Sequence, residues 1–409
     1  MNKSIVVILG GNILNSGIVD YCKQQEYFVV VVDWSPNAAL KGDLFLCIDV
    51  KDHESIINAL HANGVDHIIG AYSSIDLAVN SVNKINSHFG LSSMDDEALS
   101  NALAKSRMTE IWHQKMLLNR FSKVFTSFDD QIYQMVCQLK LIIKPNISSS
   151  SRGITILQKD SAYDLVKEAY FKAENESYDS RVIVEEFVEG QEFTCEMLGD
   201  ANGNISVYAI SVKYHTQNTE NNKIAIKLHY NSNVYSDEIY EKIASFGKAC
   251  YKALGFHTSF GHLELIRKAD GTLTPIEIGA RSSGFITNPL VSRASGQDFF
   301  GDYLSVLNGK TISGKDYING NCSSMYFFYD MPSNTSCVNP SCLVNFIKND
   351  ITALYHNRQK VQTMGYPYHA ISNDNERIGY EIIYGDRQLL TIHNVEEAEQ
   401  NFIKHNTNG

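Results

Sequence analysis

One hairpin motif constrains the fold of this chain more than any other feature. Residues 261–284 read GHLELIRKADGTLTPIEIGARSSG, so apolar and polar residues alternate on both sides of an Asp-Gly pair. This pattern predicts two antiparallel strands joined by a tight turn. If Asp270 and Gly271 are the two turn residues, the register places Glu264 directly opposite Glu277.

The predicted pairing gathers charged residues on one face of the hairpin. The polar face holds His262, Glu264, Glu277, Gly279 and Arg281, and the apolar face holds Leu263, Leu265, Ile276 and Ile278. Two opposed carboxylates are destabilising unless a counter-ion neutralises them. Hard carboxylates suit Mg²⁺, which takes one or two of them together with phosphate oxygens and water. An ordinary solvated hairpin is the alternative, but no lysine lies cross-strand from either glutamate, and small residues follow Glu277, which favours a ligand site.

Composition sets broad limits on function. The 409 residues are enough for two or three domains, and 44% hydrophobic with 20% charged residues is ordinary for a globular protein. The net charge of −11 disfavours extended contacts with nucleic-acid phosphates, while a local basic pocket for a nucleotide remains compatible with it. No apolar run reaches membrane length. We therefore expect a cytoplasmic protein that binds neither nucleic acid nor membrane.

The eight cysteines predict no metal or disulfide framework. They lie at positions 22, 47, 137, 195, 250, 322, 337 and 342, with no C-x-x-C motif. We expect free thiols in a reducing compartment. Cys337 and Cys342 are the exception, because their spacing is compatible with a metal site or a disulfide bond.

The N-terminal region alternates short apolar runs with helical patterns. The runs cover 4–9, 27–33, 44–48 and 66–70, and the helical patterns lie at about 17–25 and 53–63. This alternation predicts a parallel sheet with right-handed crossovers. Gly10-Gly11 and Asp33 resemble a dinucleotide-binding start, but the full G-x-G-x-x-G is absent, which favours a Rossmann-like domain without a nicotinamide.

The middle of the chain carries a lysine, a serine-rich loop and acidic strand ends. A helical pattern spans about 96–120, and strands are expected at 141–145, at the ITIL segment after Gly153, and at 181–188. The loop from Ser148 to Gly153 between the first two strands is rich in hydrogen-bond donors, so it is either a phosphate-binding loop with Lys144 beside it or a mobile surface loop. A helix at about 237–254 leads into the hairpin. Beyond Lys310, strands are expected in SSMYFFYD and RIGYEIIYG, and a helix near 392–404.

Taken in order, these pieces resemble the ATP-grasp superfamily of carboxylate–amine ligases. The set comprises the Rossmann-like start, ALAKSRMTEIW, LIIKP, the small-residue loop, VIVEEFVEGQEF and HLELI…PIEIGAR, over roughly residues 1 to 310. The resemblance implies a mixed fold of the α/β class, which is α+β when the whole chain is considered. It consists of a Rossmann-like domain (1–95), a two-lobed ATP-grasp domain (96–310, with a small nucleotide-covering lobe at about 110–185) and an extra C-terminal α+β lobe (311–409).

The resemblance also implies roles for matching residues. Arg281 corresponds to the catalytic arginine near the transferred phosphate, and Glu264 and Glu277 correspond to ligands of Mg²⁺, with Mn²⁺ as an alternative. The implied ATP-binding residues are Lys105, Lys144, Ser150, Ser151, Arg152, Gly153, Glu185, Glu186, Phe187, Val188 and Glu192. Many members carry Asn two residues after the second glutamate, where this chain has Gly279. Either water or phosphate replaces that ligand, or a second metal is bound more weakly.

The IEIGARSSGF segment and the C-terminal lobe look most like the L-amino-acid ligases. This resemblance implies an enzyme that activates a carboxylate as an acylphosphate and couples it to an amine. The expected partners are small-molecule carboxylates and amines, and a homodimer is compatible with the sequence. Three alternatives remain: a ligase for a sugar acid, ribosylamine or bicarbonate, a nicotinamide-dependent oxidoreductase, and a non-catalytic nucleotide-binding protein. The sequence reveals no general base, and a lone His262 favours a structural role.

Overall fold

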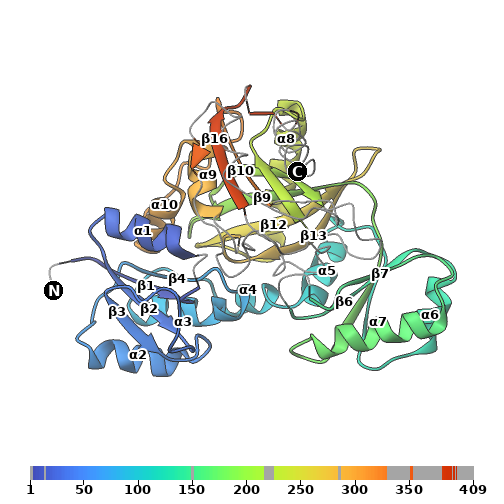
Figure 1. Ribbon diagram of the computed structural model, residues 1–409, viewed down its shortest axis with the longest axis horizontal. Helices are drawn as coiled ribbons and strands as arrows, with labels where there is room; N and C mark the ends of the chain where they lie inside the picture. Colours follow the sequence, from blue (N-terminus) through green and yellow to red (C-terminus); the bar gives the residue numbers. More distant parts are fainter. Residues whose placement is uncertain are drawn as a thin grey trace, which may run out of the picture.

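A computed structural model of the chain describes residues 3–12, 15–148, 152–215, 225–283, 287–328, 351–352, 380–388, 390–391 and 393. Several expectations fall outside these residues: the positions of Ser150 and Ser151, the pair Cys337 and Cys342, and the helix near 392–404. The described part forms three sheets. The N-terminal sheet and a small lobe lie at opposite ends of the molecule, and a large sheet lies above them (Figure 1).

The N-terminal sheet is parallel, as the strand–helix alternation predicts. Its order is β3-β2-β1-β4, and its strands are β1 (Ile5–Leu9), β2 (Phe28–Asp33), β3 (Leu44–Cys47) and β4 (Gly70–Tyr72). Helices α1 (Ser16–Gln24), α2 (His53–Ala62) and α3 (Val79–His88) accompany it. The fourth strand was expected at 66–70 but begins at Gly70, because ladder pairing with β1 starts only at Val6 opposite Gly70. Just before the strand, Ile69 already donates its backbone N–H to the carbonyl of Ile5 on β1 at 2.8 Å.

The small lobe is a four-stranded antiparallel sheet. Its order is β5-β8-β6-β7, with β5 (Ser122–Phe125), β6 (Leu141–Pro145), β7 (Thr155–Leu157) and β8 (Val182–Glu186). Helices α6 (Asp130–Val136) and α7 (Tyr163–Asn175) pack their buried side chains onto it. The strands expected from LIIKP, ITIL and RVIVEEFV are confirmed. The helical pattern at 96–120 is two helices, α4 (Asp96–Asn101) and α5 (Lys105–Gln114).

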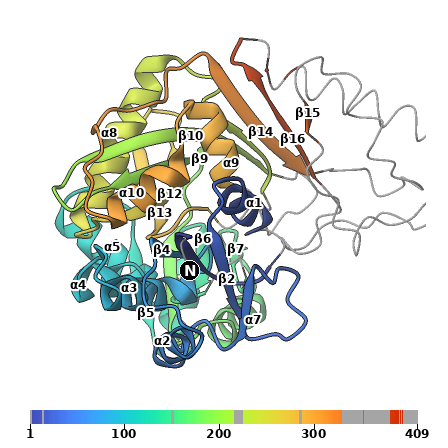
Figure 2. The ribbon, with the colours of Figure 1, turned by 90° about the vertical axis from the view of Figure 1, so that its left-hand side faces the viewer.

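The large sheet joins the hairpin to the C-terminal strands. Its order is β13-β12-β9-β10-β11-β14-β16-β15, and every described pairing is antiparallel. Its strands are β9 (Gln191–Gly199), β10 (Ile205–His215), β11 (Ala225–Tyr230), β12 (Ser259–Arg267), β13 (Leu273–Gly279), β14 (Cys322–Phe328), β15 (Ile351–Thr352) and β16 (Tyr380–Asp386). The two strands expected beyond Lys310 are confirmed as β14 and β16, and they continue this sheet (Figure 2).

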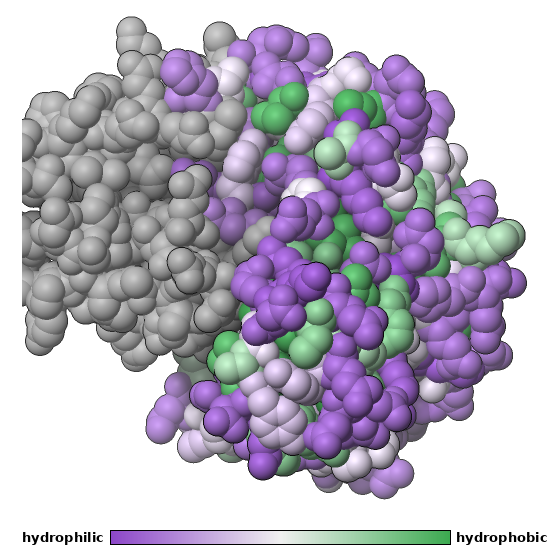
Figure 3. Space-filling model, turned by 90° about the vertical axis from the view of Figure 1, so that its right-hand side faces the viewer, coloured by the Kyte–Doolittle hydropathy of each residue, from purple (hydrophilic) through white to green (hydrophobic). Residues whose placement is uncertain are grey.

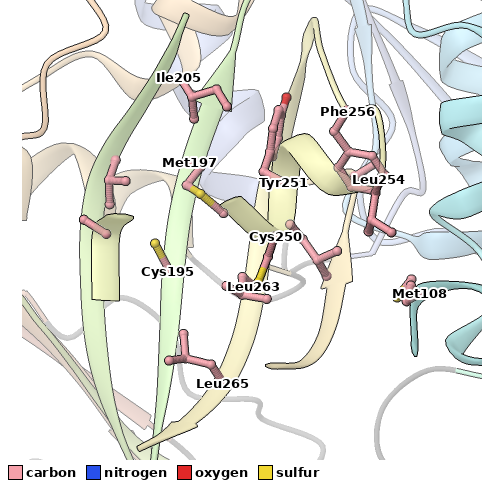
Figure 4. Close-up of a cluster of buried hydrophobic side chains, with 14 of the residues drawn as sticks. Met108, Cys195, Met197, Ile205, Cys250, Tyr251, Leu254, Phe256, Leu263 and Leu265 are labelled. Carbon is pink, nitrogen blue, oxygen red and sulfur yellow. The ribbon is translucent and has the colours of Figure 1, made fainter. Parts of the chain in front are cut away.

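Helices cover both faces of the large sheet. Helix α8 (Asp237–Ala253) packs against one face, where Cys250 and Tyr251 meet Cys195, Met197 and Leu263 of the strands (Figure 4). Helices α9 (Thr287–Ser295) and α10 (Phe299–Leu307) share a second buried cluster with the N-terminal sheet. This shared core fixes the large sheet against the Rossmann-like domain.

The described residues include no helix suited to crossing a membrane. None of the described helices combines the length and the apolar character that a membrane crossing needs. On the side of the small lobe, hydrophilic side chains predominate and apolar ones are scattered among them (Figure 3). The six cysteines in the described part of the chain are free thiols.

Candidate functional site

The β12–β13 hairpin has the predicted register at its charged end. Glu264 pairs with Glu277, and His262 pairs with Gly279. The turn differs from the expected two-residue form, because Gly271 donates its backbone N–H to the carbonyl of Lys268 and adopts a φ of 85°. A β-bulge next to Glu264 then restores the expected pairing and leaves Ile276 as the extra residue. Ile276 is therefore half-buried instead of belonging to the apolar face, which corrects the prediction.

Two lysines from other elements neutralise the opposed carboxylates. Lys213 on β10 places Nζ 2.9 Å from Oε1 of Glu264, and Lys105 at the start of α5 places Nζ 2.9 Å from Oε2 of Glu277. Burial raises the pKa of Glu264, but Lys213 and His262 together outweigh it and hold that pKa well below its usual range. Burial lowers the pKa of Lys105, yet Glu277 raises it overall. The charge balance that a cross-strand lysine would give is thus supplied from outside the hairpin.

His262 forms a buried ion pair on the same face. Its Nδ1 lies 2.8 Å from Oε1 of Glu196, which is fully buried on the neighbouring strand β9. Burial lowers the pKa of His262, but Glu196 outweighs it and raises the pKa to about 9. The imidazole is therefore positively charged at neutral pH. The sequence favoured a structural role for this histidine and gave no sign of Glu196 as its partner.

Arg281 is held by a residue that the sequence analysis missed. Its Nε and Nη2 donate to the two carboxylate oxygens of Asp76, each at 2.6 Å, and its Nη1 donates to the carbonyl of Ser282 at 2.9 Å. Asp76 opens the short helix η2 (Asp76–Ala78) that follows β4 of the N-terminal sheet. The two residues are 205 positions apart, and no local motif marks Asp76 as a partner.

A cavity brings these charged groups together. Its walls come from η2, the α4–α5 connection, the start of the serine-rich loop and the hairpin. The residues that line it are Asp76, Leu77, Ala102, Leu103, Lys105, Met108, Ile147, Ser148, Tyr178, His262, Glu277, Ile278, Gly279 and Arg281. The proposed site residues Lys105, Glu277 and Arg281 therefore share one cavity, and Glu264 is not among the residues that line it.

Lys144 and Glu185 contact each other inside the small lobe. Nζ of Lys144 lies 2.7 Å from Oε2 of Glu185, and Nη2 of Arg120 lies 2.9 Å from Oε1 of the same carboxylate. All three side chains are at most 5% exposed. Burial raises the pKa of Glu185, but Arg120 and then Lys144 outweigh it and lower the pKa. Lys144, the expected phosphate-binding lysine, thus forms an ion pair with Glu185, the expected adenine-edge carboxylate. Arg120 also pairs with Glu185, and the sequence did not reveal this contact.

The expected adenine-edge residues Glu186, Phe187 and Val188 lie at the end of β8 and directly after it. The backbone N–H groups of Glu186 and Phe187 already donate to the carbonyls of Phe121 and Lys140, both at 3.0 Å. Val188 follows them and is buried. An adenine edge at this segment would therefore have to use groups other than those two N–H donors.

Glu192 lies at the start of β9, next to the hairpin. Its carboxylate pairs with Lys213, and its Oε2 lies 3.0 Å from Nε2 of His215. Because Lys213 also contacts Glu264, it links the expected ribose and metal carboxylates. Burial raises the pKa of Glu192, but Lys213 and His215 together lower it.

The described end of the serine-rich loop contacts residues that directly follow α7. Nε of Arg152 lies 3.8 Å from Oε2 of Glu176, and its Nη2 donates to the hydroxyl of Tyr178 at 3.4 Å. Gly153 has a φ of 71°, and a Cβ there would lie 2.9 Å from both Pro145 and Glu176 side-chain atoms. The tight approach explains why this position is a glycine.

The donor set suits a cation that is held jointly with a nucleotide. Among the described residues, no group of three or more His, Cys, Asp or Glu side chains is arranged to hold a metal ion alone. Glu264 and Glu277 offer two hard carboxylates on adjacent strands. Mg²⁺ commonly uses one or two carboxylates and fills its other positions with phosphate oxygens and water. The residues present therefore fit a Mg²⁺–nucleotide complex.

Comparisons with known proteins agree with this fold. The sequence profile of the ATP-grasp domain matches residues 137–288. A D-alanine–D-alanine ligase from Cupriavidus taiwanensis is 26% identical over 230 residues, which are 52% of this chain and 66% of that ligase, slightly under two thirds of its length.

Two solved structures share the architecture over nearly the whole chain. An L-amino acid ligase from Bacillus licheniformis has a TM-score of 0.71 at 15% identity and covers 99% of this chain and 98% of its own. An N5-carboxyaminoimidazole synthetase from Staphylococcus aureus, complexed with ADP, has a TM-score of 0.69 at 11% identity and covers 98% of this chain and 97% of its own. The predicted resemblance to the ATP-grasp superfamily is confirmed by the match at residues 137–288, and the fold is shared over nearly the whole chain.

Proposed function

We propose that this protein is an ATP-dependent carboxylate–amine ligase with an amino acid substrate. The substrate carboxylate attacks the γ-phosphate of ATP to give an acylphosphate and ADP. An amine then attacks the acyl carbon, and phosphate leaves as the amide or peptide bond forms. The observation that carries the proposal is the opposed pair Glu264 and Glu277, of which Glu277 lines a cavity together with Lys105 and Arg281.

The chain's own residues would act by positioning and by neutralising charge. In phosphoryl transfer, positive groups around the transferred phosphate contribute more than covalent chemistry by the protein. Lys105 and Arg281 supply such groups, and Arg281 would stabilise the transferred phosphoryl group and the oxyanion of the tetrahedral intermediate. Glu264 and Glu277 would hold Mg²⁺, which neutralises phosphate charge when it is bound.

The nucleotide would lie between the small lobe and the large sheet. Lys144 and the segment from Glu185 to Val188 are on the small lobe, and Glu192 is at the start of β9. In this proposal the Lys144 ammonium would donate to a phosphate, and the Glu192 carboxylate would accept hydrogen bonds from the ribose hydroxyls. Ser150, Ser151, Arg152 and Gly153 belong to the proposed covering loop. In this proposal the enzyme is cytoplasmic and its partners are small molecules.

The direct test is a product-release screen. Purified protein with ATP and Mg²⁺ is offered pairs drawn from amino acids, amines and uronic acids, and both ADP and phosphate are measured. Stoichiometric release that requires both members of a pair supports a ligase. ATP binding without release for any pair would favour the non-catalytic alternative.

A variant pair tests the metal assignment. Glu277→Gln removes one of the two hard carboxylates and is expected to lower turnover by about 100-fold or more, with an unchanged circular dichroism spectrum. Glu238→Gln is the matched control, because Glu238 pairs with Lys242 on the exposed surface of α8. A Glu277→Gln rate within a few-fold of the unmodified protein at saturating Mg²⁺ would contradict the assignment.

The likeness to the carboxyaminoimidazole synthetase favours one alternative substrate class. The same site would activate a sugar acid or bicarbonate, and a ribosylamine would then be the attacking amine, so bicarbonate with ribosylamines is included in the screen. For the nicotinamide alternative, the test is thermal stabilisation. ATP with Mg²⁺ should raise the melting temperature, and NAD(P) should not.

A further inference from the structure

We propose that Asp76, which the N-terminal domain supplies, is a positioning residue for Arg281, and that Gly279 provides the space this pair needs. The inference rests on the proposed function, in which Arg281 contacts the transferred phosphoryl group. It gives the Rossmann-like domain a part in phosphoryl transfer that does not involve binding a dinucleotide.

The geometry of the pair fixes the guanidinium plane. A guanidinium has five N–H donors in a rigid fork. Three of them are used, two by Asp76 and one by the carbonyl of Ser282. Among the described residues the other two have no protein acceptor, and Arg281 lines the cavity. A bidentate carboxylate therefore presents the free donors in one fixed orientation.

Gly279 is packed closely against this pair. A Cβ at position 279 would lie 3.3 Å from Cγ of Arg281, 3.5 Å from its Cζ and 3.5 Å from Oδ1 of Asp76. A methyl group there would already be tight, and the longer side chain of asparagine would compete with the pair for the same volume. These contacts explain why a glycine occupies position 279, where many ATP-grasp proteins carry an asparagine that binds the metal.

The loop that carries Asp76 is braced by the glycine turn after β1. Ile75 packs over Gly10, where a Cβ would lie only 2.6 Å from Cδ1 of Ile75, and Gly10 has a φ of 107°. The hydroxyl of Ser73 donates to the carbonyl of Leu9 at 2.7 Å. The turn that resembles a dinucleotide-binding motif is therefore filled by the chain itself.

The carboxylate after β2 is also used within the protein. Asp33 accepts the backbone N–H of Gly11 at 2.7 Å and that of Ser35 at 2.8 Å. In dinucleotide-binding domains an acidic residue after the second strand hydrogen-bonds the ribose. In this chain it stabilises the loops that surround the glycine turn.

A second contact ties the residue after Arg281 to the same domain. The hydroxyls of Tyr72 and Ser282 are 2.7 Å apart, and Nδ2 of Asn288 donates to both, at 3.0 Å and 2.9 Å. All three side chains are buried. Both the backbone after Arg281 and its guanidinium are therefore anchored to the end of β4.

The test uses Asp76→Asn, which keeps the size but removes one acceptor and the negative charge. Its control, Asp66→Asn, makes the same charge change at an exposed residue that contacts His61. Thermal stabilisation is measured with ADP and Mg²⁺, and then with aluminium fluoride added as a mimic of the transferred phosphoryl group. We expect unchanged stabilisation by ADP and Mg²⁺ in both variants. Affinity for aluminium fluoride should fall about tenfold or more in Asp76→Asn alone.

Gly279→Ala is a second variant, which crowds the Asp76–Arg281 pair and leaves the Asp76 carboxylate in place. It should weaken aluminium fluoride binding as well, whereas Gly320→Ala, where a Cβ meets no atom within 4 Å, should not. Aluminium fluoride affinity that is unchanged in both Asp76→Asn and Gly279→Ala would overturn the proposal. So would a substrate KM that rises in Asp76→Asn while kcat stays constant, since that result marks a substrate-binding residue. If the unmodified protein shows no response to ADP and Mg²⁺, the proposed function itself fails.

Discussion

Replacing Glu185 by glutamine should destabilise the small lobe strongly. The carboxylate lies between Arg120 and Lys144, with N–O distances of 2.9 Å and 2.7 Å and almost no solvent exposure. Glutamine would leave two buried cations with no counter-charge. Removing one partner of a buried ion pair typically costs about 3–5 kcal/mol, because the remaining charge stays desolvated.

The assay is urea and thermal unfolding of the nucleotide-free protein. For a cooperative unit of about 150–250 residues, each kcal/mol shifts the melting temperature by about 2–4 °C, so a decrease of about 6–20 °C is expected. Glu189→Gln is the matched control, because Glu189 pairs with Lys140 at the same 2.9 Å but its side chain is 76% exposed. That substitution should change the free energy of unfolding by less than about 1 kcal/mol.

The pH dependence gives an independent check on Glu185. Its pKa is lower in the folded state, so its stabilisation is present above the unfolded pKa of about 4.5 and is lost as the pH falls through the folded value. The difference between Glu185→Gln and the unmodified protein should therefore shrink below about pH 4.5. An unfolding free energy within about 1 kcal/mol of the unmodified protein at neutral pH would refute the reasoning.

Two further predictions concern stability. Because the pKa of His262 rises to about 9, its pairing with Glu196 stabilises the metal-free protein fully below about pH 6.5 and is lost as the pH rises through about 9. His262→Gln should remove up to about 3 kcal/mol of this pH dependence in unfolding titrations, and an unchanged profile would contradict the pairing. Gly10→Ala should cost about 1–3 kcal/mol because of its positive φ and the contact with Ile75. Gly64→Ala shares a positive φ but meets no atom, so it should cost less in the same urea titration, and equal losses would contradict the steric argument.

Local sequence patterns predicted much of the fold, because the signals lie within a few residues. The alternation around Glu264 and Glu277 predicted their pairing, and the apolar runs predicted the parallel sheet. The three-residue turn and the bulge at Ile276 were not predicted. Each shifts the strand register by one residue, and the two shifts compensate each other, so Glu264 still pairs with Glu277. Strand parity alone cannot detect such compensation.

The partners of the charged residues were beyond sequence reasoning. Asp76, Glu196 and Arg120 carry no motif, and each meets its partner only through tertiary packing across 65 or more positions. The roles of Lys105 and Glu192 were implied by the family resemblance, whereas the pairing of Glu264 with Glu277 followed from the alternation. Which lysine would neutralise which glutamate depends on how three sheets come together.

The attachment of β14 to β11 has a consequence for any shortened form of this protein. The backbone of β11 from Lys227 to Tyr230 pairs on one side with β10 and on the other with β14. A chain that stopped at Lys310 would lose β14 and leave β11 as an exposed edge strand of a large sheet. Unpaired edges of this kind promote intermolecular strand pairing and aggregation. The C-terminal strands therefore cover an edge of the large sheet that a shortened chain would expose.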